Sequence, residues 1–260
     1  MMGSIAFDRA ADYYDATRGL SDDGALQMTD ALSGVFAGAR RPVLEVGVGT
    51  GQIAVPLRQR GIPVAGIDLS RAMLMKLLEK SREGPTIQLV EGDATAMPFP
   101  DDTFDGAYLR WVLHLIADWR AAVREIARVT RSGGSFLAAL GSQGGVRAEI
   151  QSRFAEITGI STEPAGLSWS GWEDLDDEVD TLGGTKLPDV VLHDRERDTL
   201  ETFVSGIEAN MYSWTWAVEN PELRGQASAE VRRWAEERLG SLDAVPREPF
   251  EWRFAAYRMA

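Results

Sequence analysis

An apolar run that leads into three alternating glycines constrains the fold of this chain more than any other feature. The run contains Glu45 and continues directly into Gly47, Gly49 and Gly51. Asp68 lies 17 residues beyond the last of these glycines, where a second apolar run ends. A strand, a tight glycine turn, a helix and a second strand that ends in an acid form the general layout of a nucleoside-binding Rossmann unit.

The residues around the glycines argue against a dinucleotide ligand. The third small residue of the pyrophosphate fingerprint would fall on Gln52. Glu45 would repel a pyrophosphate at the helix N-terminus, but it suits a ligand with positive charge. No Lys-Ser or Lys-Thr follows the glycines, which excludes a Walker-type loop. S-adenosylmethionine fits this pattern, because it joins a ribose diol to a sulfonium and an ammonium and has no phosphate.

Four ordered segments make the chain resemble a known family over the stretch from Phe7 to about Leu140. It is similar to class I S-adenosylmethionine-dependent methyltransferases, of the small-molecule type found in ubiquinone and menaquinone biosynthesis. The segments are 45–51; 66–70 with Met73; 91–94 with 97–99, leading into 104–108; and 113–118 with 125–129 and 133–134. One glycine motif would be weak evidence, whereas four segments in the family's order and spacing are specific.

The hydrophobic pattern predicts an α/β fold, a Rossmann-like doubly wound and mostly parallel sheet of seven strands. We expect strands at 43–47, 63–67, 86–90, 104–109, 135–140, 188–193 and 250–258. We expect helices at 23–36, 119–130, 145–158, 171–182, 198–217 and 221–239, with Gly133 and Gly134 ending the second of them. The resemblance implies that the last strand is antiparallel and inserted beside the fifth.

These elements predict a single methyltransferase domain over residues 1–260. Its parts are an N-terminal cap at 1–36, a cofactor-binding core at 42–140, a helical lid and acceptor region with one strand at 141–248, and the last strand at 249–260. The family resemblance weakens beyond residue 141, where the acceptor half of the site is expected.

The family resemblance assigns roles to residues that follow the strands, where ligands of open parallel sheets bind. Asp68 would accept hydrogen bonds from the ribose hydroxyls, and Glu45 would reach the methionine end. Asp93 and the backbone of Ala94 would bind the adenine amino group, between the apolar side chains of Leu69 and Met73. The loop residues Gly47, Val48, Gly49 and Gly51 would let the backbone approach the ligand. The alternative for the acids is that they cap the helices behind them.

Three further residues resemble groups that close over the methionine carboxylate. Tyr14 and Arg18 are candidates in the N-terminal segment. The alternative is that they belong to an exposed polar helix end, which would have the same sequence pattern. Arg110 follows the fourth expected strand, where the family usually has a small polar residue. His114 is the one titratable candidate for a general base in the matched region, with a structural role as the favoured alternative.

Composition limits the partners of the chain. The net charge of −13 opposes binding to nucleic acid, which requires clustered cations. Residues 109–112 also lack the Asn/Asp-Pro-Pro-Tyr/Phe segment of the family's nucleic-acid base methylators. The chain has no cysteine, no signal-like start and no apolar run of membrane-spanning length. We therefore expect a cytoplasmic protein that does not bind nucleic acid. The family resemblance further implies methylation of a small molecule with formation of S-adenosylhomocysteine, and we expect a monomer or homodimer that uses no metal.

The region after residue 141 carries aromatic and acidic clusters. Trp169, Trp172, Trp214 and Trp216 could enclose an apolar or aromatic acceptor, although helical spacing favours a core position for Trp172. The acidic run at 173–180 is interpreted as solvated surface rather than a metal site. Two alternatives to methyl transfer remain open: a non-methylating S-adenosylmethionine-dependent enzyme of the same fold, and a non-catalytic binder of the same nucleoside.

Overall fold

The computed structural model describes residues 6–140, 145–194, 198–245 and 250–260. The chain forms two compact units. The first, which we call the sheet unit, comprises residues 1–141, 164–193 and 251–260; the second, the helical unit, comprises 142–163 and 194–250. Residues 164–193, which lie within the expected lid region, therefore pack with the sheet.

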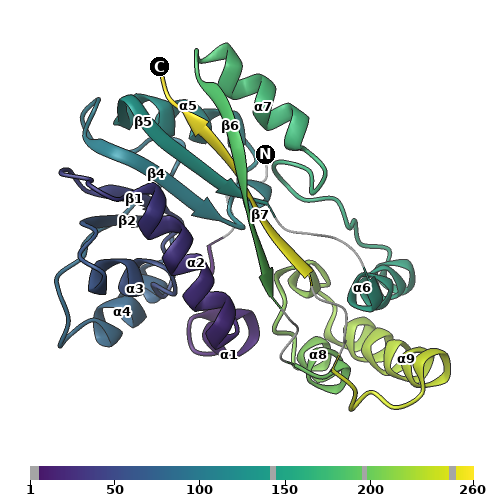
Figure 1. Cartoon of the computed structure of the whole chain (residues 1–260). Helices are drawn as coiled ribbons and strands as arrows, with labels where there is room; N and C mark the ends of the chain where they lie inside the picture. Colours follow the sequence, from purple (N-terminus) through teal and green to yellow (C-terminus); the bar gives the residue numbers. More distant parts are fainter. Residues whose placement is uncertain (1–5, 141–144, 195–197, 246–249) are drawn as a thin grey trace. The chain divides into compact units, whose positions relative to one another are not determined.

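The sheet unit is built on one seven-stranded sheet in the order β3-β2-β1-β4-β5-β7-β6 (Figure 1). The strands are β1 Val43–Val46, β2 Val64–Asp68, β3 Gln88–Glu91, β4 Phe104–Arg110, β5 Thr130–Ala139, β6 Thr185–Asp194 and β7 Phe250–Arg258. Neighbouring strands from β3 to β5 run parallel, and β7 is antiparallel to β5. The predicted fold class is confirmed. The strand order reverses between β1 and β4, and ligands of such sheets bind at the carboxyl ends of these strands.

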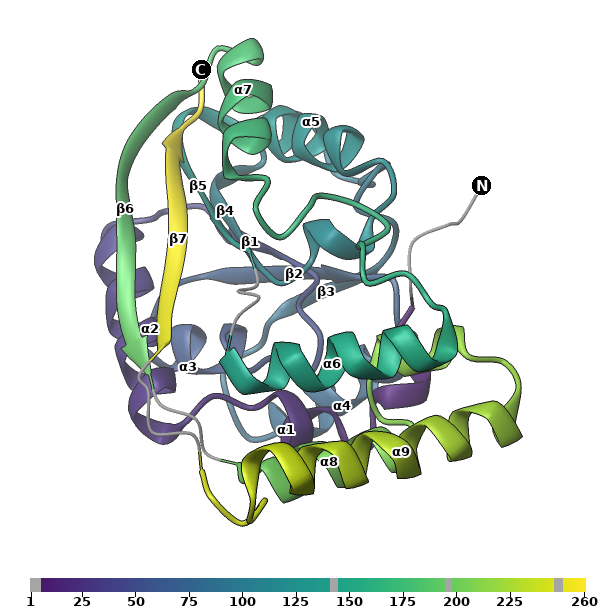
Figure 2. The same cartoon turned by 90° about the vertical axis from the view of Figure 1, so that its right-hand side faces the viewer.

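Helices cover both faces of this sheet (Figure 2). The helices α2 Asp22–Val35, α3 Ala54–Gln59 and α4 Arg71–Lys80 lie on one face, and α5 Trp119–Val129 and α7 Trp172–Thr181 lie on the other. Hydroxyl or carboxylate side chains cap α2, α4 and α5, since Ser21, Ser70 and Asp118 each accept a backbone N–H bond. Three short helices complete the unit: η1 Asp8–Ala10, α1 Tyr14–Arg18 and η2 Leu113–Leu115.

Two expected element boundaries are wrong. Helix α5 ends at Val129 and β5 begins at once at Thr130, so Gly133 and Gly134 lie within the strand instead of ending the helix. Gly133 has a φ of +72°, and both glycines bond to Met259 at the end of β7. The glycine pair therefore serves an irregular strand that pairs with the last strand, a role that local helix-stop rules do not consider.

The second wrong boundary concerns the helix expected over 198–217. Helix α8 covers Leu200–Glu208 and is followed by the 3₁₀ helix η3 at Ser213–Ala217. Asn210 interrupts them with a φ of +57°, a left-handed conformation that asparagine tolerates better than most residues. The other helices of this unit, α6 Gly145–Thr158 and α9 Pro221–Leu239, have the bounds expected from the sequence.

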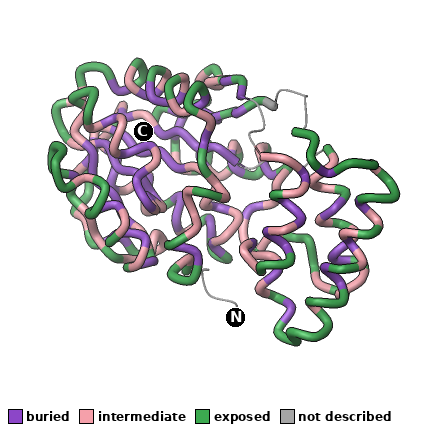
Figure 3. Tube along the Cα trace, turned by 90° about the horizontal axis from the view of Figure 1, so that it is seen from below, coloured by how far each residue is buried: buried purple, intermediate pink, exposed green. Residues whose placement is uncertain are grey.

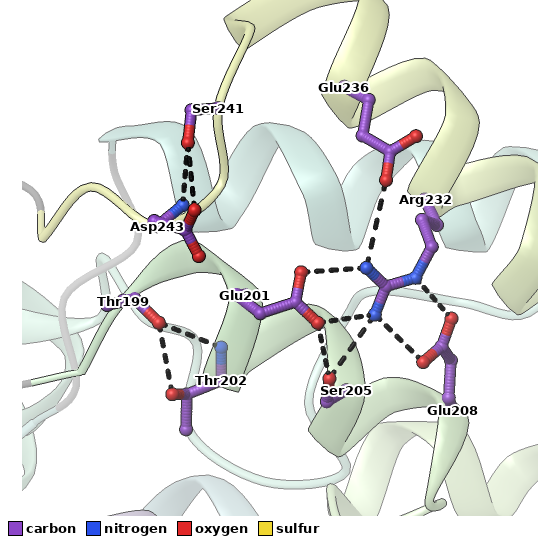
Figure 4. A network of polar contacts seen from close by, with 9 residues as sticks. All are labelled: Thr199, Glu201, Thr202, Ser205, Glu208, Arg232, Glu236, Ser241 and Asp243. Atoms are coloured by element: carbon purple, nitrogen blue, oxygen red, sulfur yellow. Dashed lines mark hydrogen bonds and ion pairs between the residues drawn. The ribbon is translucent and has the colours of Figure 1, made fainter.

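The helical unit has its own apolar core, formed by α6, α8 and α9 around Phe154, Val204 and Val231. Buried positions alternate with exposed ones along its helices, as they do in the sheet unit (Figure 3). Arg232 joins α9 to α8 through Glu201 and Glu208 (Figure 4). No helix among the described residues is both long and apolar enough to cross a membrane.

Candidate functional site

The glycine loop after β1 folds tightly against β2. Gly47, Gly49 and Gly51 have φ values of +69°, +52° and +78°, a region that side chains with a Cβ rarely adopt. A Cβ on Gly47 would lie 2.4 Å from Val112, and one on Gly51 would lie 2.7 Å from Leu77. A Cβ on Gly49 would meet nothing closer than 4.0 Å. Packing thus requires the first and last glycines, whereas Gly49 faces open space where a ligand could approach the backbone.

Asp68 lies at the end of β2, directly against this loop. Its Oδ2 accepts the N–H of Gly49 at 2.7 Å, and its Oδ1 accepts the N–H of Ser70 at 2.8 Å. Burial raises the pKa of this carboxyl, against the lowering effect of these two bonds. The backbone of Leu69 makes a further contact with this carboxyl. A carboxylate has about four acceptor positions, so these contacts still leave room for a ribose hydroxyl. The capping and binding roles that the sequence offered as alternatives are therefore compatible.

Glu45 lies inside β1, with 4% of its surface exposed. Its Oε2 accepts a hydrogen bond from the hydroxyl of Tyr108 on β4 at 2.9 Å. Burial raises the pKa of Glu45 to about 8, although Tyr108 and the nearby Arg110 lower it. This carboxyl is expected to remain protonated at neutral pH until a cation approaches it.

The N-terminal segment, residues 8–15, runs along α4 and touches the glycine loop; we call it the strap. Asp8 accepts bonds from Ser70 and Ala72 at the start of α4, and Asp12 pairs with Lys76 one turn later. Asp15 pairs with Lys80 at the end of α4.

Asp15 also holds the glycine loop. It accepts bonds from the hydroxyl of Thr50 and, at 3.0 Å, from the amide of Gln52. Burial raises the pKa of Asp15, but these bonds and the Lys80 ammonium together outweigh it and lower the pKa, so a charged carboxylate holds the strap in place.

The three predicted carboxylate-binding candidates have different surroundings. Arg110 donates to Gln52 at 3.0 Å and to the carbonyl of Arg18 at 3.5 Å, so the structure brings these two arginines together. Tyr14 packs edge-on against Phe7 at 6.0 Å.

His114 lies on η2 and packs against Trp169 with the two rings tilted and their centroids 4.3 Å apart. Burial and the neighbouring Arg18 lower the pKa of His114 to about 3. A neutral imidazole of such low basicity is a weak proton acceptor, which favours the structural role over general-base catalysis.

The predicted adenine-binding residues follow β2 and β3. Leu69 is exposed at the rim of the site, as an apolar wall for a ligand would be. Met73 is 2% exposed and belongs to the core beneath that rim, and Val48 is 3% exposed and packs on Gly66. If Val48 contacts the cofactor, it would therefore do so through its backbone.

Asp93 binds the N–H and hydroxyl of Thr95, both at 2.8 Å. Ala94 packs against the core. The turn that carries both residues is held from α5, because Arg128 donates to the carbonyls of Met97 and Phe99.

Aromatic residues gather just beyond β4. Trp111 has a φ of +59°, unusual for a bulky residue, and its ring packs in a tilted arrangement against that of Trp252 on β7, with centroids 4.8 Å apart. The guanidinium of Arg110 lies 4.8 Å from the Trp111 ring. Of the aromatic residues that the sequence proposed for the acceptor pocket, Trp172 packs against the core of the sheet unit, and Trp214 packs on Tyr212 in the helical unit.

The acidic run on α7 is a surface feature, with ion pairs to its neighbours. Glu178 pairs with Arg120 and Arg124 of α5, and Asp176 binds Lys186. Among the described residues no three His, Asp or Glu side chains lie close enough together to hold a metal ion. A groove of about 570 Å³ beside Trp234 in the helical unit contains none of the predicted site residues.

Sequence reasoning assigned no role to Tyr108, Asp15 or Lys80. Tyr108 could have been found, because the expected strands place it level with Glu45 on the neighbouring strand. Asp15 and Lys80 meet across 65 residues of sequence, and no local pattern predicts such a contact.

Residues 44–138 match a family described as "Methyltransferase domain". The chain is 35% identical to a demethylmenaquinone methyltransferase of Renibacterium salmoninarum over 138 residues, which are 51% of this chain and 56% of that protein. It is 41% identical to a phosphatidylethanolamine N-methyltransferase of Cereibacter sphaeroides over 95 residues, 35% of this chain and 46% of that protein. The chain thus spans about half the length of the curated relatives it matches.

Solved structures of low sequence identity share the fold. The 4+2 cyclase SpnF superposes with a TM-score of 0.62 at 19% identity, over 99% of this chain and 98% of that one. The YcgJ protein of Bacillus subtilis superposes with a TM-score of 0.54 at 20% identity, over 90% of this chain and 96% of that one.

Proposed function

We propose that this chain is a class I S-adenosylmethionine-dependent methyltransferase that transfers a methyl group from S-adenosylmethionine to a small molecule. The match of residues 44–138 to the methyltransferase-domain family supports this proposal. The observation that carries the proposal is the contact between Asp68 and the glycine loop. Gly49 combines a left-handed backbone with open space, and the Asp68 carboxylate meets its N–H at 2.7 Å. Asp68 would thereby offer an acceptor for the ribose hydroxyls beside a backbone that a nucleoside could approach.

The residues present fit each part of the cofactor. Asp68 would bind the ribose hydroxyls, and Asp93 with Ala94 would bind the adenine beside Leu69 and above Met73. The buried carboxyl of Glu45 would receive the ammonium. Arg18, Arg110 and Tyr14 would surround the carboxylate, with the backbone of Gly47, Val48 and Gly51 as the floor of the site.

When bound, S-adenosylmethionine supplies an activated methyl group on a sulfonium leaving group. The contribution of the protein is then to hold the acceptor in line and to exclude water, and orientation supplies most of the rate. His114 has a pKa of about 3, so it would serve as a wall of the site rather than as a strong base. This favours acceptors whose nucleophile is reactive without a strong base.

Two of the relatives described above are named for demethylmenaquinone and phosphatidylethanolamine. In line with these names, we propose a largely apolar or aromatic acceptor. We also propose a single methyltransferase domain in which the region 141–248 supplies the residues that bind the acceptor. From the sequence we also propose that the protein acts in the cytoplasm as a monomer or homodimer and needs no metal ion.

The test is calorimetric titration of the full chain with S-adenosylhomocysteine, followed by transfer of a labelled methyl group to quinol and amine acceptors. We expect Asp68→Ala to weaken binding by about ten- to a hundredfold, the loss of one or two bonds to a charged group. The control Asp30→Ala removes an exposed ion pair with Arg60 and should bind normally. If the wild-type protein binds no S-adenosylhomocysteine, the proposal is wrong. If the protein binds S-adenosylhomocysteine and converts an acceptor to a product that carries no labelled methyl group, it is a non-methylating enzyme.

A further inference from the structure

Tyr108 and Glu45 form a buried pair at the point where the strand order of the sheet reverses. They are direct neighbours in the register of β4 and β1, and the tyrosine hydroxyl donates to Oε2 of the carboxyl at 2.9 Å. Tyr108 is completely buried and Glu45 is 4% exposed. A buried tyrosine hydroxyl needs an acceptor, but any backbone carbonyl would serve. Here the acceptor is instead a titratable carboxyl at the ligand-binding rim.

The ring of Tyr108 is held rigidly, so its hydroxyl has a fixed place. Phe36, at the end of α2, packs against it with ring centroids 5.8 Å apart. Phe36 can approach this closely because of Gly106, where a Cβ would lie 2.6 Å from the Phe36 ring. Strand β4, which carries both Gly106 and Tyr108, and Phe36 at the end of α2 therefore fix the position of the hydroxyl that binds Glu45.

Charged and polar groups face Glu45 from three sides. Asp68 of β2 disfavours its ionised form, whereas Arg110 of β4 and the backbone N–H of Ala54 at α3 favour it, together with Tyr108. Burial outweighs these favourable contacts and raises the pKa to about 8. Near neutral pH this carboxyl is therefore mostly neutral, and an approaching cation could convert it to a carboxylate.

We propose that Tyr108 is a positioning residue that holds Oε2 of Glu45, leaves the second oxygen for the ammonium of the cofactor, and couples cofactor binding to release of a proton. The proton leaves the Glu45 carboxyl for the solvent, and no covalent bond other than that O–H bond is broken. This inference rests on the proposed function, because it assigns the ammonium of S-adenosylmethionine to Glu45.

Comparing two ligands distinguishes a role of Tyr108 in binding the ammonium from a role in stabilising the fold. S-adenosylhomocysteine carries the ammonium, and 5′-methylthioadenosine has the same nucleoside without it. Each is titrated calorimetrically at pH 7 in two buffers of different ionisation enthalpy. For wild-type protein we expect release of close to one proton per S-adenosylhomocysteine and far less for 5′-methylthioadenosine, because a group with a pKa of about 8 is mostly protonated there.

Tyr108→Phe removes one hydroxyl and keeps the ring. We expect its affinity for S-adenosylhomocysteine to fall about tenfold or more, the loss of a bond to a charged group, with affinity for 5′-methylthioadenosine within about twofold of wild type. The matched control is Tyr257→Phe, a buried tyrosine whose hydroxyl donates to Asp176 at 2.6 Å on another part of the sheet unit. It should leave both affinities unchanged.

The pH dependence of the wild-type protein gives a test that needs no variant. Affinity for S-adenosylhomocysteine should rise up to about tenfold per pH unit between pH 6 and 8 and then level, because the proton no longer has to leave. Affinity for 5′-methylthioadenosine should stay flat. The inference is overturned if no proton is released on binding of S-adenosylhomocysteine, or if Tyr108→Phe weakens both ligands equally. Failure of the wild-type protein to bind either ligand would instead contradict the proposed function.

Discussion

Replacing Glu45 with glutamine should stabilise the ligand-free protein near neutral pH. The size of this effect depends on how far burial raises the pKa of the Glu45 carboxyl. The pKa of Glu45 is raised from 4.5 to about 8 in the folded chain. Below pH 4.5 both states hold the proton, and above pH 8 both have lost it. Between these values the unfolded chain ionises first, so the folded state loses about 1.4 kcal/mol per pH unit relative to the unfolded state.

The expected effect is a change in the stability difference between the two proteins. From pH 5 to pH 7.5, the free energy of unfolding of Glu45→Gln should gain about 3 kcal/mol relative to wild type, as an order of magnitude. Urea unfolding at each pH measures it. Hydrogen exchange should also be measured for peptides from β1 and β4. The two compact units need not unfold together, and these peptides report on the unit that contains Glu45.

A second glutamate provides a control of opposite sign. Arg128 and the N–H of Met97 lower the pKa of Glu125, so its contribution to stability is present at neutral pH and is lost on acidification. Glu125→Gln should therefore be destabilised at pH 7.5, with a smaller effect at low pH. If the difference between Glu45→Gln and wild type stays flat from pH 5 to 7.5, the carboxyl is already ionised in the folded protein and the reasoning about its burial is wrong.

Three further substitutions test other parts of the molecule. Gly49→Ala should cost about 1–2 kcal/mol through its left-handed backbone and abolish nucleoside binding measured by calorimetry, whereas Gly34→Ala, on the exposed surface of α2, should be neutral or slightly stabilising. Asp15→Asn should increase hydrogen exchange in the strap and weaken cofactor binding a few fold, and unchanged exchange would show that its pairing with Lys80 does not hold the strap. Arg232→Met should lower the melting temperature of the protein, since two glutamates of α8 lose their partner; an unchanged melting temperature would contradict this role.

The sheet was predictable because its signals are local. Alternating apolar strands and amphipathic helices fix the order of elements, and the glycines before α3 mark the turn. Two predictions were wrong: Gly133 does not end a helix, and the helix expected over 198–217 is interrupted at Asn210. Gly133 pairs with the last strand of the chain, a contact across 126 residues that no window of sequence contains.

By itself the sequence determined the fold class, the glycine loop and the acid Asp68, because each depends on residue types at short and regular spacing. Only the tertiary structure decided the electrostatic state of the site. It buried Glu45 beside Tyr108 and lowered the basicity of His114, and it fastened the strap to α4 through Asp15. The physical reason is that a pKa depends on solvent exclusion and on charges within a few ångströms, and both are set by chain segments far apart in the sequence.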